Sequence, residues 1–278
     1  MKKISRRSFL AAAGLSVAAL ALTACGGSAS SVASSVASSA SSAAASTSAA
    51  AGELTTVEAG KLTMATNAAF PPYEMTTDAG DFEGIDIETA QAIADKLGLE
   101  LQIDDMDFDA ALLSVQQGKA DIVMAGVTVT DERKAVMDFS DSYATGIQSI
   151  IVPEGSDIAS PDDLAGKKIG TQRGTTGYIY CSDDFGDDSV VAYDDGLTAV
   201  QALNNGQVDA VVIDNAPAQE FVAANPGLKI LDTSYAEEDY AIGVAKNSPL
   251  EDAINSALEE LKSDGTLQAI VDKYITAE

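Results

Sequence analysis

The sequence predicts an α/β fold built from two similar lobes that follow a leader and a flexible tether. Short apolar runs of strand length alternate with segments that repeat apolar residues at helical spacing, which favours sheets with many parallel strands. Two helix–strand units resemble each other at an offset of 88 residues. With 278 residues, the chain is long enough for two lobes of ordinary size.

The first residues are typical of an export signal. Basic residues precede the apolar run 9–22, which is too short to span a membrane comfortably. Residues 22–25 (L-T-A-C) resemble a lipobox, so we expect a lipoprotein signal peptide over 1–24 and a lipid on Cys25. An ordinary signal peptide with an incidental cysteine is the alternative. Residues 5–10 (S-R-R-S-F-L) also resemble a twin-arginine signal, so Sec and Tat export both stay open.

Residues 26–52 are almost only Ser, Ala, Gly and Val and carry no charge. Such a segment is a flexible tether, with a root-mean-square span of roughly 30 Å. We therefore expect an extracytoplasmic protein that is anchored to the cell membrane through Cys25, with residues 25–52 as the lipidated leash and the folded body starting at residue 53.

Charge and composition exclude several classes of function. The formal net charge of −27 becomes four units more negative when the basic leader is removed, and such a surface repels nucleic acid and anionic lipid head groups. The chain has no histidine, which excludes His-based metal sites and Ser-His-Asp or Cys-His catalysis. Beyond Cys25, Cys181 has no disulfide partner and is expected to pack as a small apolar residue. We expect no metal, no cofactor and no catalytic residue.

The first part of the body predicts strands and helices in alternation around a loop with paired prolines at 67–73. The expected strands are 61–66, 99–103 and 122–124, and the expected helices are 85–97 and 108–117. A short helix then starts near Arg133.

The second part continues in the same style. The expected strands are 147–152, 168–171, 189–192, 209–213 and 240–245. The expected helices are 197–205, 250–261 and 267–275, with a Ser-capped turn at 160–164 and a helix start at 176–181. The turn at 172–177 is not a Walker loop, yet its exposed N–H groups suit an anion such as a carboxylate.

The internal repeat points to a site. Gly118 aligns with Gly206 and Asp121 with Asp209, although the sequence pattern common to helix–strand units could produce one such match by chance. Because ligands of α/β lobes bind beyond the carboxyl ends of the strands, the repeat indicates Gly126 in one lobe and Asp214 in the other.

Arg133 is an arginine in the first turn of a helix, where acids are favoured instead. We expect its guanidinium to wait for a ligand carboxylate, which arginine grips with two parallel hydrogen bonds. A surface arginine paired with Asp131 or Asp138 is the alternative.

Eight further segments, in this order, resemble the family 3 extracellular solute-binding proteins, the polar amino-acid receptors of ABC importers, over about residues 54–278. They are F-P-P-Y-E (70–74), G-I-D-I-E-T-A-Q-A-I-A (84–94), D-F-D-A-A-L (107–112), A-G-V-T-V-T-D-E-R (125–133), D-F-S-D-S-Y (138–143), D-L-A-G-K-K-I-G (163–170), R-G-T-T-G (173–177) and V-D-A-V-V-I-D (208–214).

The resemblance implies a type II periplasmic-binding-protein-like clamshell with two crossing hinge strands. Lobe 1 is then about 53–143 plus 241–278, lobe 2 about 147–236, and the hinge 143–147 and 236–240. It also implies a monomer that captures a free amino acid, expected to be polar, and delivers it to an ABC permease in the membrane without making or breaking a bond.

The resemblance implies roles for ten residues. Arg133 would bind the ligand carboxylate and Asp214 the ammonium, although Asp214 also reads as a helix N-cap and both roles can hold. The remaining expected contacts are Gly126 and Thr128 to the ammonium, with Thr128 also near the carboxylate, Thr175 and Thr176 to the carboxylate, Phe70 and Phe108 as walls, and Asn67 and Gln172 as selectivity residues.

Each of these residues has a plainer interpretation. The two threonines at 175 and 176 could serve only turn and cap chemistry, and the two phenylalanines only core packing. An amide at Asn67, where receptors for cationic ligands tend to place an acid, favours a neutral polar side chain on the ligand.

Two rival functions stay open. A dehydratase or lytic transglycosylase on the same scaffold would need a carboxylate in the cleft, for which Glu74 and Asp109 are the nearest candidates. The sensor half of a signalling receptor is the other rival, and no transmembrane helix follows Glu278.

Overall fold

The computed structural model describes residues 54–275, which form one compact unit. The predicted signal peptide, the lipid site at Cys25 and the whole tether lie outside the described residues. Among the described residues, no helix is both long and apolar enough to cross a bilayer.

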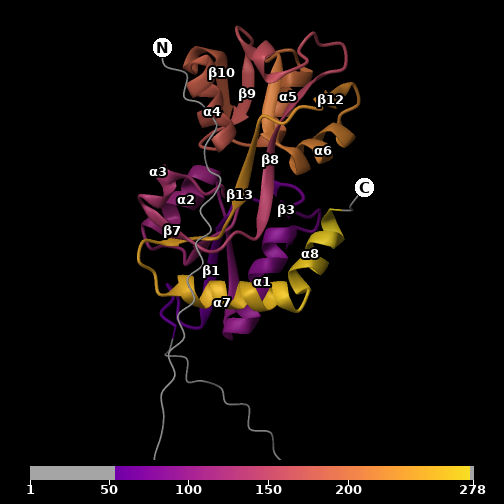
Figure 1. Ribbon diagram of the computed structural model, residues 1–278. Helices are drawn as coiled ribbons and strands as arrows, with labels where there is room; N and C mark the ends of the chain where they lie inside the picture. The colour runs from indigo at the N-terminus through magenta and orange to yellow at the C-terminus, as the bar shows by residue number, and fades with distance from the viewer. Residues whose placement is uncertain (1–53, 276–278) are drawn as a thin grey trace, which may run out of the picture. The chain divides into compact units, whose positions relative to one another are not determined.

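Two mixed sheets, each covered by helices, make two lobes that share a pair of long strands (Figure 1). This is the predicted two-lobe clamshell. The lobe and hinge boundaries given from the sequence stay predictions.

The sheet of lobe 1 has the order β5-β1-β6-β14-β7, with parallel pairing from β5 to β6 and antiparallel pairing from β6 to β7. Its strands are β1 (Lys61–Thr66), β5 (Glu100–Asp105), β6 (Ile122–Val123), β7 (Met137–Phe139) and β14 (Gly243–Ala245). A small antiparallel sheet consists of β2 (Ala69–Phe70), which lies within the stretch 67–73 predicted as loop, and of β3 (Glu74–Thr76) and β4 (Phe82–Glu83), which follow it.

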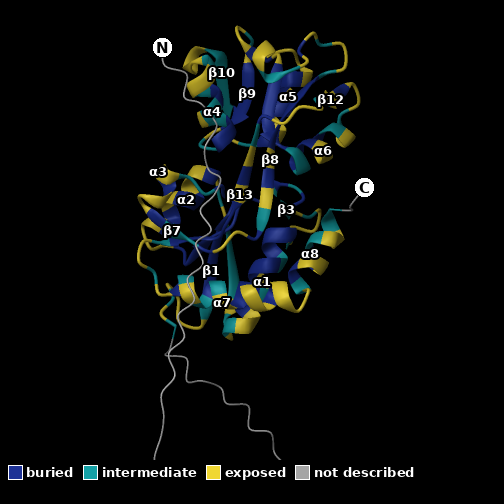
Figure 2. Cartoon of the chain, viewed as in Figure 1, coloured by how far each residue is buried: buried dark blue, intermediate teal, exposed yellow. Residues whose placement is uncertain are grey.

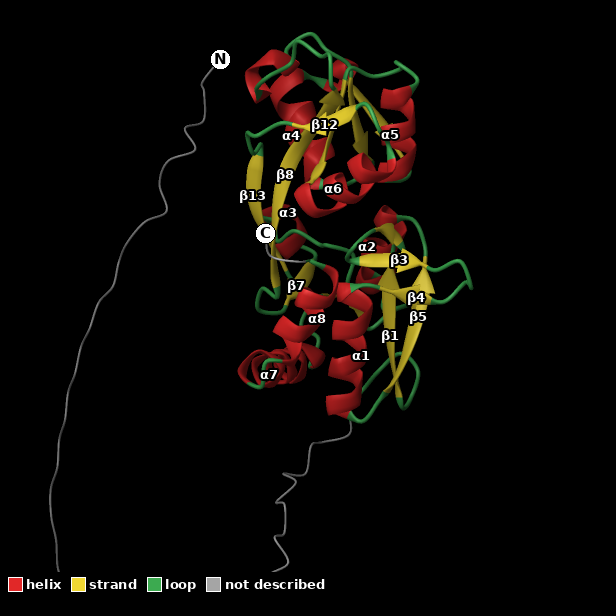
Figure 3. Ribbon diagram, turned by 90° about the vertical axis from the view of Figure 1, so that its right-hand side faces the viewer, coloured by secondary structure: helices red, strands yellow, loops and turns green. Residues whose placement is uncertain are grey.

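The helices of lobe 1 cover its five-stranded sheet, and each of them buries one face. They are α1 (Ile85–Leu97), α2 (Phe108–Gln116), α3 (Asp131–Lys134), α7 (Leu250–Ser263) and α8 (Thr266–Tyr274). α1 ends as predicted at Gly98, which takes the left-handed conformation that glycine favours. α7 and α8 pack against α1 and turn their exposed faces outward (Figures 2 and 3).

The sheet of lobe 2 has the order β10-β9-β11-β8-β12, and β13 pairs with the free length of β8. Its strands are β8 (Ala144–Pro153), β9 (Ile169–Gln172), β10 (Val190–Tyr193), β11 (Ala210–Asp214), β12 (Leu228–Ile230) and β13 (Ala236–Tyr240). Its helices are α4 (Thr176–Phe185), α5 (Gly196–Asn204) and α6 (Asn215–Ala224), with short 3₁₀ turns at Pro161–Leu164 and Asp187–Ser189.

Strands β8 and β13 run antiparallel between the lobes, from Gln148 opposite Ala236 to Ala144 opposite Tyr240 (Figure 1). The prediction of one strand over 240–245 is wrong. The chain leaves β8 at Tyr240, and Ala241 donates its N–H to Val127 before β14 joins the lobe 1 sheet at Gly243. The change of pairing partner divides the segment into two strands.

The internal repeat has a structural basis. Gly118 and Gly206 both have φ near 65°, at 65° and 66°, and end their helices in the same left-handed turn. Asp121 then accepts hydrogen bonds from the N–H groups of Val57 (2.7 Å) and Thr63 (2.8 Å), and Asp209 accepts one from Lys168 (2.7 Å). In both lobes this acid therefore fastens the strand that follows the helix to its neighbour.

We expect Asp121→Asn to lower the free energy of unfolding by about 2 kcal/mol, because the new amide nitrogen would face a backbone donor and leave it unpaired. Urea unfolding checks this, with Asp78→Asn in an exposed turn as the control that should stay within about 0.5 kcal/mol of wild type. Equal midpoints for the two variants would contradict this role.

Candidate functional site

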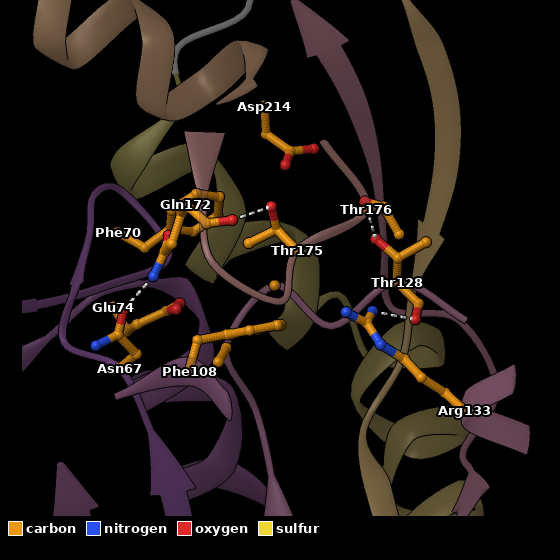
Figure 4. A pocket seen from close by; sticks show the side chains of 12 residues that line it. Asn67, Phe70, Glu74, Phe108, Thr128, Arg133, Gln172, Thr175, Thr176 and Asp214 are labelled. Atoms are coloured by element: carbon orange, nitrogen blue, oxygen red, sulfur yellow. Dashed lines mark hydrogen bonds between the residues drawn. The ribbon is translucent and has the colours of Figure 1, made fainter. Parts of the chain in front are cut away.

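One cavity between the lobes is lined by all ten residues that the resemblance singles out (Figure 4). The space inside it is about 310 Å³ when open solvent is included. Lobe 1 contributes Asn67, Phe70, Phe108, Gly126, Thr128 and Arg133, and lobe 2 contributes Gln172, Thr175, Thr176 and Asp214. Glu74 and Ala125 complete the lining.

Arg133 is buried and stands on α3, which begins where the Thr130 hydroxyl accepts a hydrogen bond from the Arg133 N–H. Its guanidinium donates to the carbonyl oxygens of Thr128 (2.7 Å) and of Gly174 in the other lobe (3.1 Å). The guanidinium carbon lies 5.4 Å from the centre of the Phe108 ring.

The alternative surface role for Arg133 does not hold. Asp138 pairs with Lys246 (2.5 Å) instead, and no acid in the described part of the chain forms an ion pair with the guanidinium. Burial lowers the pKa of Arg133, and the nearby negative charge of Glu238 raises it. An arginine stays charged in either case. The cavity therefore contains a cation that forms no ion pair within the described part of the chain.

Asp214 supplies the opposite charge at the end of β11. Its Oδ2 accepts a hydrogen bond from Gln148 Nε2 (2.7 Å), and the hydroxyl of Tyr240 also interacts with the carboxylate. Burial raises the pKa of Asp214 to about 7, and the nearby Glu238 carboxylate adds to this. The N-cap interpretation is wrong for the side chain, because Asp214 precedes α6 but makes no capping hydrogen bond.

Gly126 has a left-handed φ of +54°, and a Cβ there would lie 2.9 Å from the Phe70 ring. Its N–H donates to Asp86 Oδ2 (3.0 Å), and the hydroxyl of Tyr143 donates to Asp86 Oδ1 (2.7 Å). Burial raises the pKa of Asp86 to about 6, which these hydrogen bonds oppose. The buried acid of α1 thus holds the turn that leads to Thr128.

The turn before α4 contributes the lobe 2 threonines. Thr175 caps α4 by accepting from the Tyr178 N–H (3.3 Å), and its hydroxyl donates to the Gln172 carbonyl (2.8 Å). The plainer cap interpretation is therefore correct for this hydroxyl, while the residue still lines the cavity. Thr176 lies 3.4 Å from Thr128 across the two lobes, oxygen to oxygen.

The opposite end of the cavity is formed by Phe70, Phe108, Asn67, Gln172 and Glu74 (Figure 4). Gln172 Nε2 donates to Asn67 Oδ1 (2.8 Å) and to the carbonyl of Asp194 (3.2 Å). Its amide oxygen is left as an acceptor. Both phenylalanines are buried, so they pack in the core and line the cavity at once.

Glu74 is fully buried, and its carboxyl group interacts with that of Asp86. Burial raises its pKa well above the usual range, and the charge of neighbouring Asp86 adds to the effect. Sequence reasoning considered Glu74 only as an acid for an enzyme, because nothing in the F-P-P-Y-E stretch shows which way its side chain points.

Two further residues beneath the cavity escaped the sequence analysis. Gln148 of β8 and Glu238 of β13 are buried on the crossing strands and are hydrogen-bonded to each other (3.0 Å). The alternation of A-E-E-D-Y was the available signal, since a strand that buries Tyr240 also turns Glu238 inward.

Residues 62–277 match the family model of the bacterial extracellular solute-binding proteins, family 3. The chain belongs to this family. A probable histidine-binding protein of Neisseria gonorrhoeae is 33% identical over 275 residues, which cover 96% of this chain and 95% of the relative. The L-cystine-binding protein TcyJ of Escherichia coli is 33% identical over 226 residues, covering 80% and 85%.

The solved structure of ArtJ, an arginine-, lysine- and histidine-binding protein of Geobacillus stearothermophilus, has the same fold. It superposes with a TM-score of 0.75 at 34% identity and covers 78% of this chain and 96% of its own. These relatives are binding proteins, so they give no support to the rival interpretation as an enzyme.

Gly174 has φ +75°, and a Cβ there would collide with the carboxylate of Asp109 in lobe 1, which would have to turn aside. We expect Gly174→Ala to hold the lobes apart and to weaken ligand binding about tenfold or more. Gly166→Ala is the matched control, with φ +78° in the same lobe but open space around the new methyl. Calorimetry on both variants separates the effect of backbone strain from that of blocked lobe closure. Equal losses of ligand affinity in the two variants would contradict the proposed role of Gly174 in closure.

Proposed function

We propose that this protein captures a free amino acid with a cationic side chain, arginine foremost, between its two lobes and delivers it to the permease of an ABC importer. The observation that carries the proposal is the placement of opposite charges around one cavity. Arg133 projects from lobe 1 and Asp214 ends a strand of lobe 2, and both are buried. A zwitterion is the ligand that neutralises both.

The carboxylate of the ligand is proposed to meet Arg133 and the N–H groups of the turn before α4. Three guanidinium donors are left after the hydrogen bonds to Thr128 and Gly174, enough for a two-point contact. The ammonium is proposed to meet Asp214 Oδ1, the oxygen that does not accept the hydrogen bond from Gln148.

Orientation of the ligand sets the class of its side chain. With its carboxylate at Arg133, the ligand extends between Phe70 and Phe108 towards Glu74, Asn67 and Gln172 (Figure 4). The amide oxygen of Gln172 can only accept hydrogen bonds, and the same holds for the carboxylate of Glu74 once it is ionised. A guanidinium offers donors and a charge that compensates the buried acid. Glu74 supplies the acidic group that is absent at Asn67, and it therefore favours a cationic over a neutral side chain on the ligand.

Binding and closure are one event in this proposal. Hydrogen bonds from Arg133 to Gly174 and from Gln172 to Asn67 join the lobes directly, and a ligand between them adds contacts to both. The closed protein would present both lobes to the permease. Proteins of this family act outside the cytoplasm. We propose further that Cys25 carries the lipid anchor, that residues 26–52 are its tether, and that the protein is a monomer.

We expect Glu74→Gln to weaken arginine binding by about tenfold to a hundredfold, because a buried guanidinium would lose its charged partner. Glutamine binding should change much less. Isothermal titration against both amino acids checks this ratio. Glu83→Gln removes an exposed acid from neighbouring β4 and should leave both affinities unchanged. An unchanged ratio in Glu74→Gln would refute the cationic assignment and leave a neutral polar ligand.

Affinity should fall as the pH drops below about 7. Burial raises the pKa of Asp214 to about 7 in the free protein, and the ligand ammonium binds the ionised form. Below that pH, binding must displace a proton, which lowers the affinity up to about tenfold per pH unit, and above it the affinity levels off. Calorimetry with glutamine between pH 5 and 8 isolates Asp214, since Glu74 steepens the fall only for cationic ligands. A flat profile would contradict this.

A further inference from the structure

Glu238 lies at the centre of a hydrogen-bond cluster beneath the ligand cavity. Its Oε2 accepts from Thr176 Oγ1 (2.9 Å), from Gln148 Nε2 (3.0 Å) and from Thr128 Oγ1 (3.2 Å). The donors come from lobe 2, from the crossing strand β8 and from lobe 1 respectively. The acid itself stands on the other crossing strand and is 7% exposed.

These contacts decide which way the two threonine hydroxyls point. A hydroxyl has one hydrogen and two lone pairs. Each threonine gives its hydrogen to a carboxylate, the strongest acceptor at hand, in a charge-assisted bond. Thr128 and Thr176 also line the cavity, so they can offer only lone pairs to a ligand.

Acceptors at this place suit an ammonium group. Gln148 Nε2 bridges Glu238 Oε2 and Asp214 Oδ2, so the threonine hydroxyls and the Asp214 carboxylate belong to one cluster. Tyr180 also interacts with the Glu238 carboxylate. The cluster thus places the carboxylates of Glu238 and Asp214 close together, joined by Gln148, although burying an acid is unfavourable for stability.

We infer that Glu238 is a positioning residue that turns Thr128 and Thr176 into acceptors for the ligand ammonium. This rests on the proposed function. It reassigns Thr176 from the carboxylate to the ammonium end, and it leaves the carboxylate to Arg133 and the backbone of the turn at 174–177. Because Thr128 and Thr176 come from different lobes, the acid also joins the lobes in the closed arrangement.

The test measures how strongly the protein prefers an α-ammonium. Titration calorimetry compares L-arginine with 5-guanidinopentanoate, which is arginine without its ammonium, and L-glutamine with glutaramate. In Glu238→Gln the new amide can donate to the threonine oxygens, so their hydrogens turn to the cavity. We expect the preference for the ammonium-bearing ligand to fall at least tenfold. A purely structural role would weaken both members of each pair equally.

Two controls keep the test sharp. Glu237→Gln removes the same charge from the exposed face of β13 and should leave the preference unchanged. Thr176→Val should lose the preference and Thr176→Ser should keep it, which tests the inference even where Glu238→Gln does not fold. If the wild type binds no amino acid, the proposed function falls together with this inference. If it binds one but the variants keep the wild-type preference, or lose both ligands equally, only this inference falls.

Discussion

The structure depends on a buried guanidinium that forms no ion pair with an acid in residues 54–275. An uncompensated charge in a protein interior costs several kcal/mol, and removing a partner from a buried pair has about that effect. Arg133 is held by two carbonyl oxygens and a phenylalanine ring, which satisfy its hydrogen bonds without neutralising it. Two buried acids, Asp214 and Glu74, line the same cavity and form no ion pair with any described cation. The charged groups that line the cavity are thus complementary to those of an amino acid, which would neutralise them.

The crossing strands connect this pattern to closure. β8 and β13 carry Gln148 and Glu238, whose side chains lie directly beneath the groups that would hold the ammonium. The strands that permit the lobes to move therefore also carry part of the site. Contacts from both lobes converge there, so a ligand that satisfies them stabilises the closed form by its differential affinity for it. Charge recognition and lobe closure have the same physical origin.

Much of this could be predicted from sequence, because the signals are local. The apolar periodicity of α1 and the glycine after it define that helix to the residue, and the repeat around Asp121 and Asp209 reflects a shared way of fastening strands. The site residues stand at strand ends and turns, where motif and topology agree. What escaped depends on long-range register. Glu238 acquires its role only when β13 pairs with β8, and the orientation of Glu74 follows from the small sheet that its neighbours form.

We propose that one ligand carries both charges, because the groups that would bind its carboxylate and its ammonium belong to different lobes. Calorimetry of the wild-type protein with arginine, argininamide and N-acetylarginine is the decisive measurement. Argininamide keeps the ammonium and lacks the carboxylate, and N-acetylarginine does the reverse. Each derivative is expected to bind at least about a hundredfold more weakly than arginine, since each leaves one buried charge unpaired. Binding of either derivative with the affinity of arginine would rule out a ligand held at both poles.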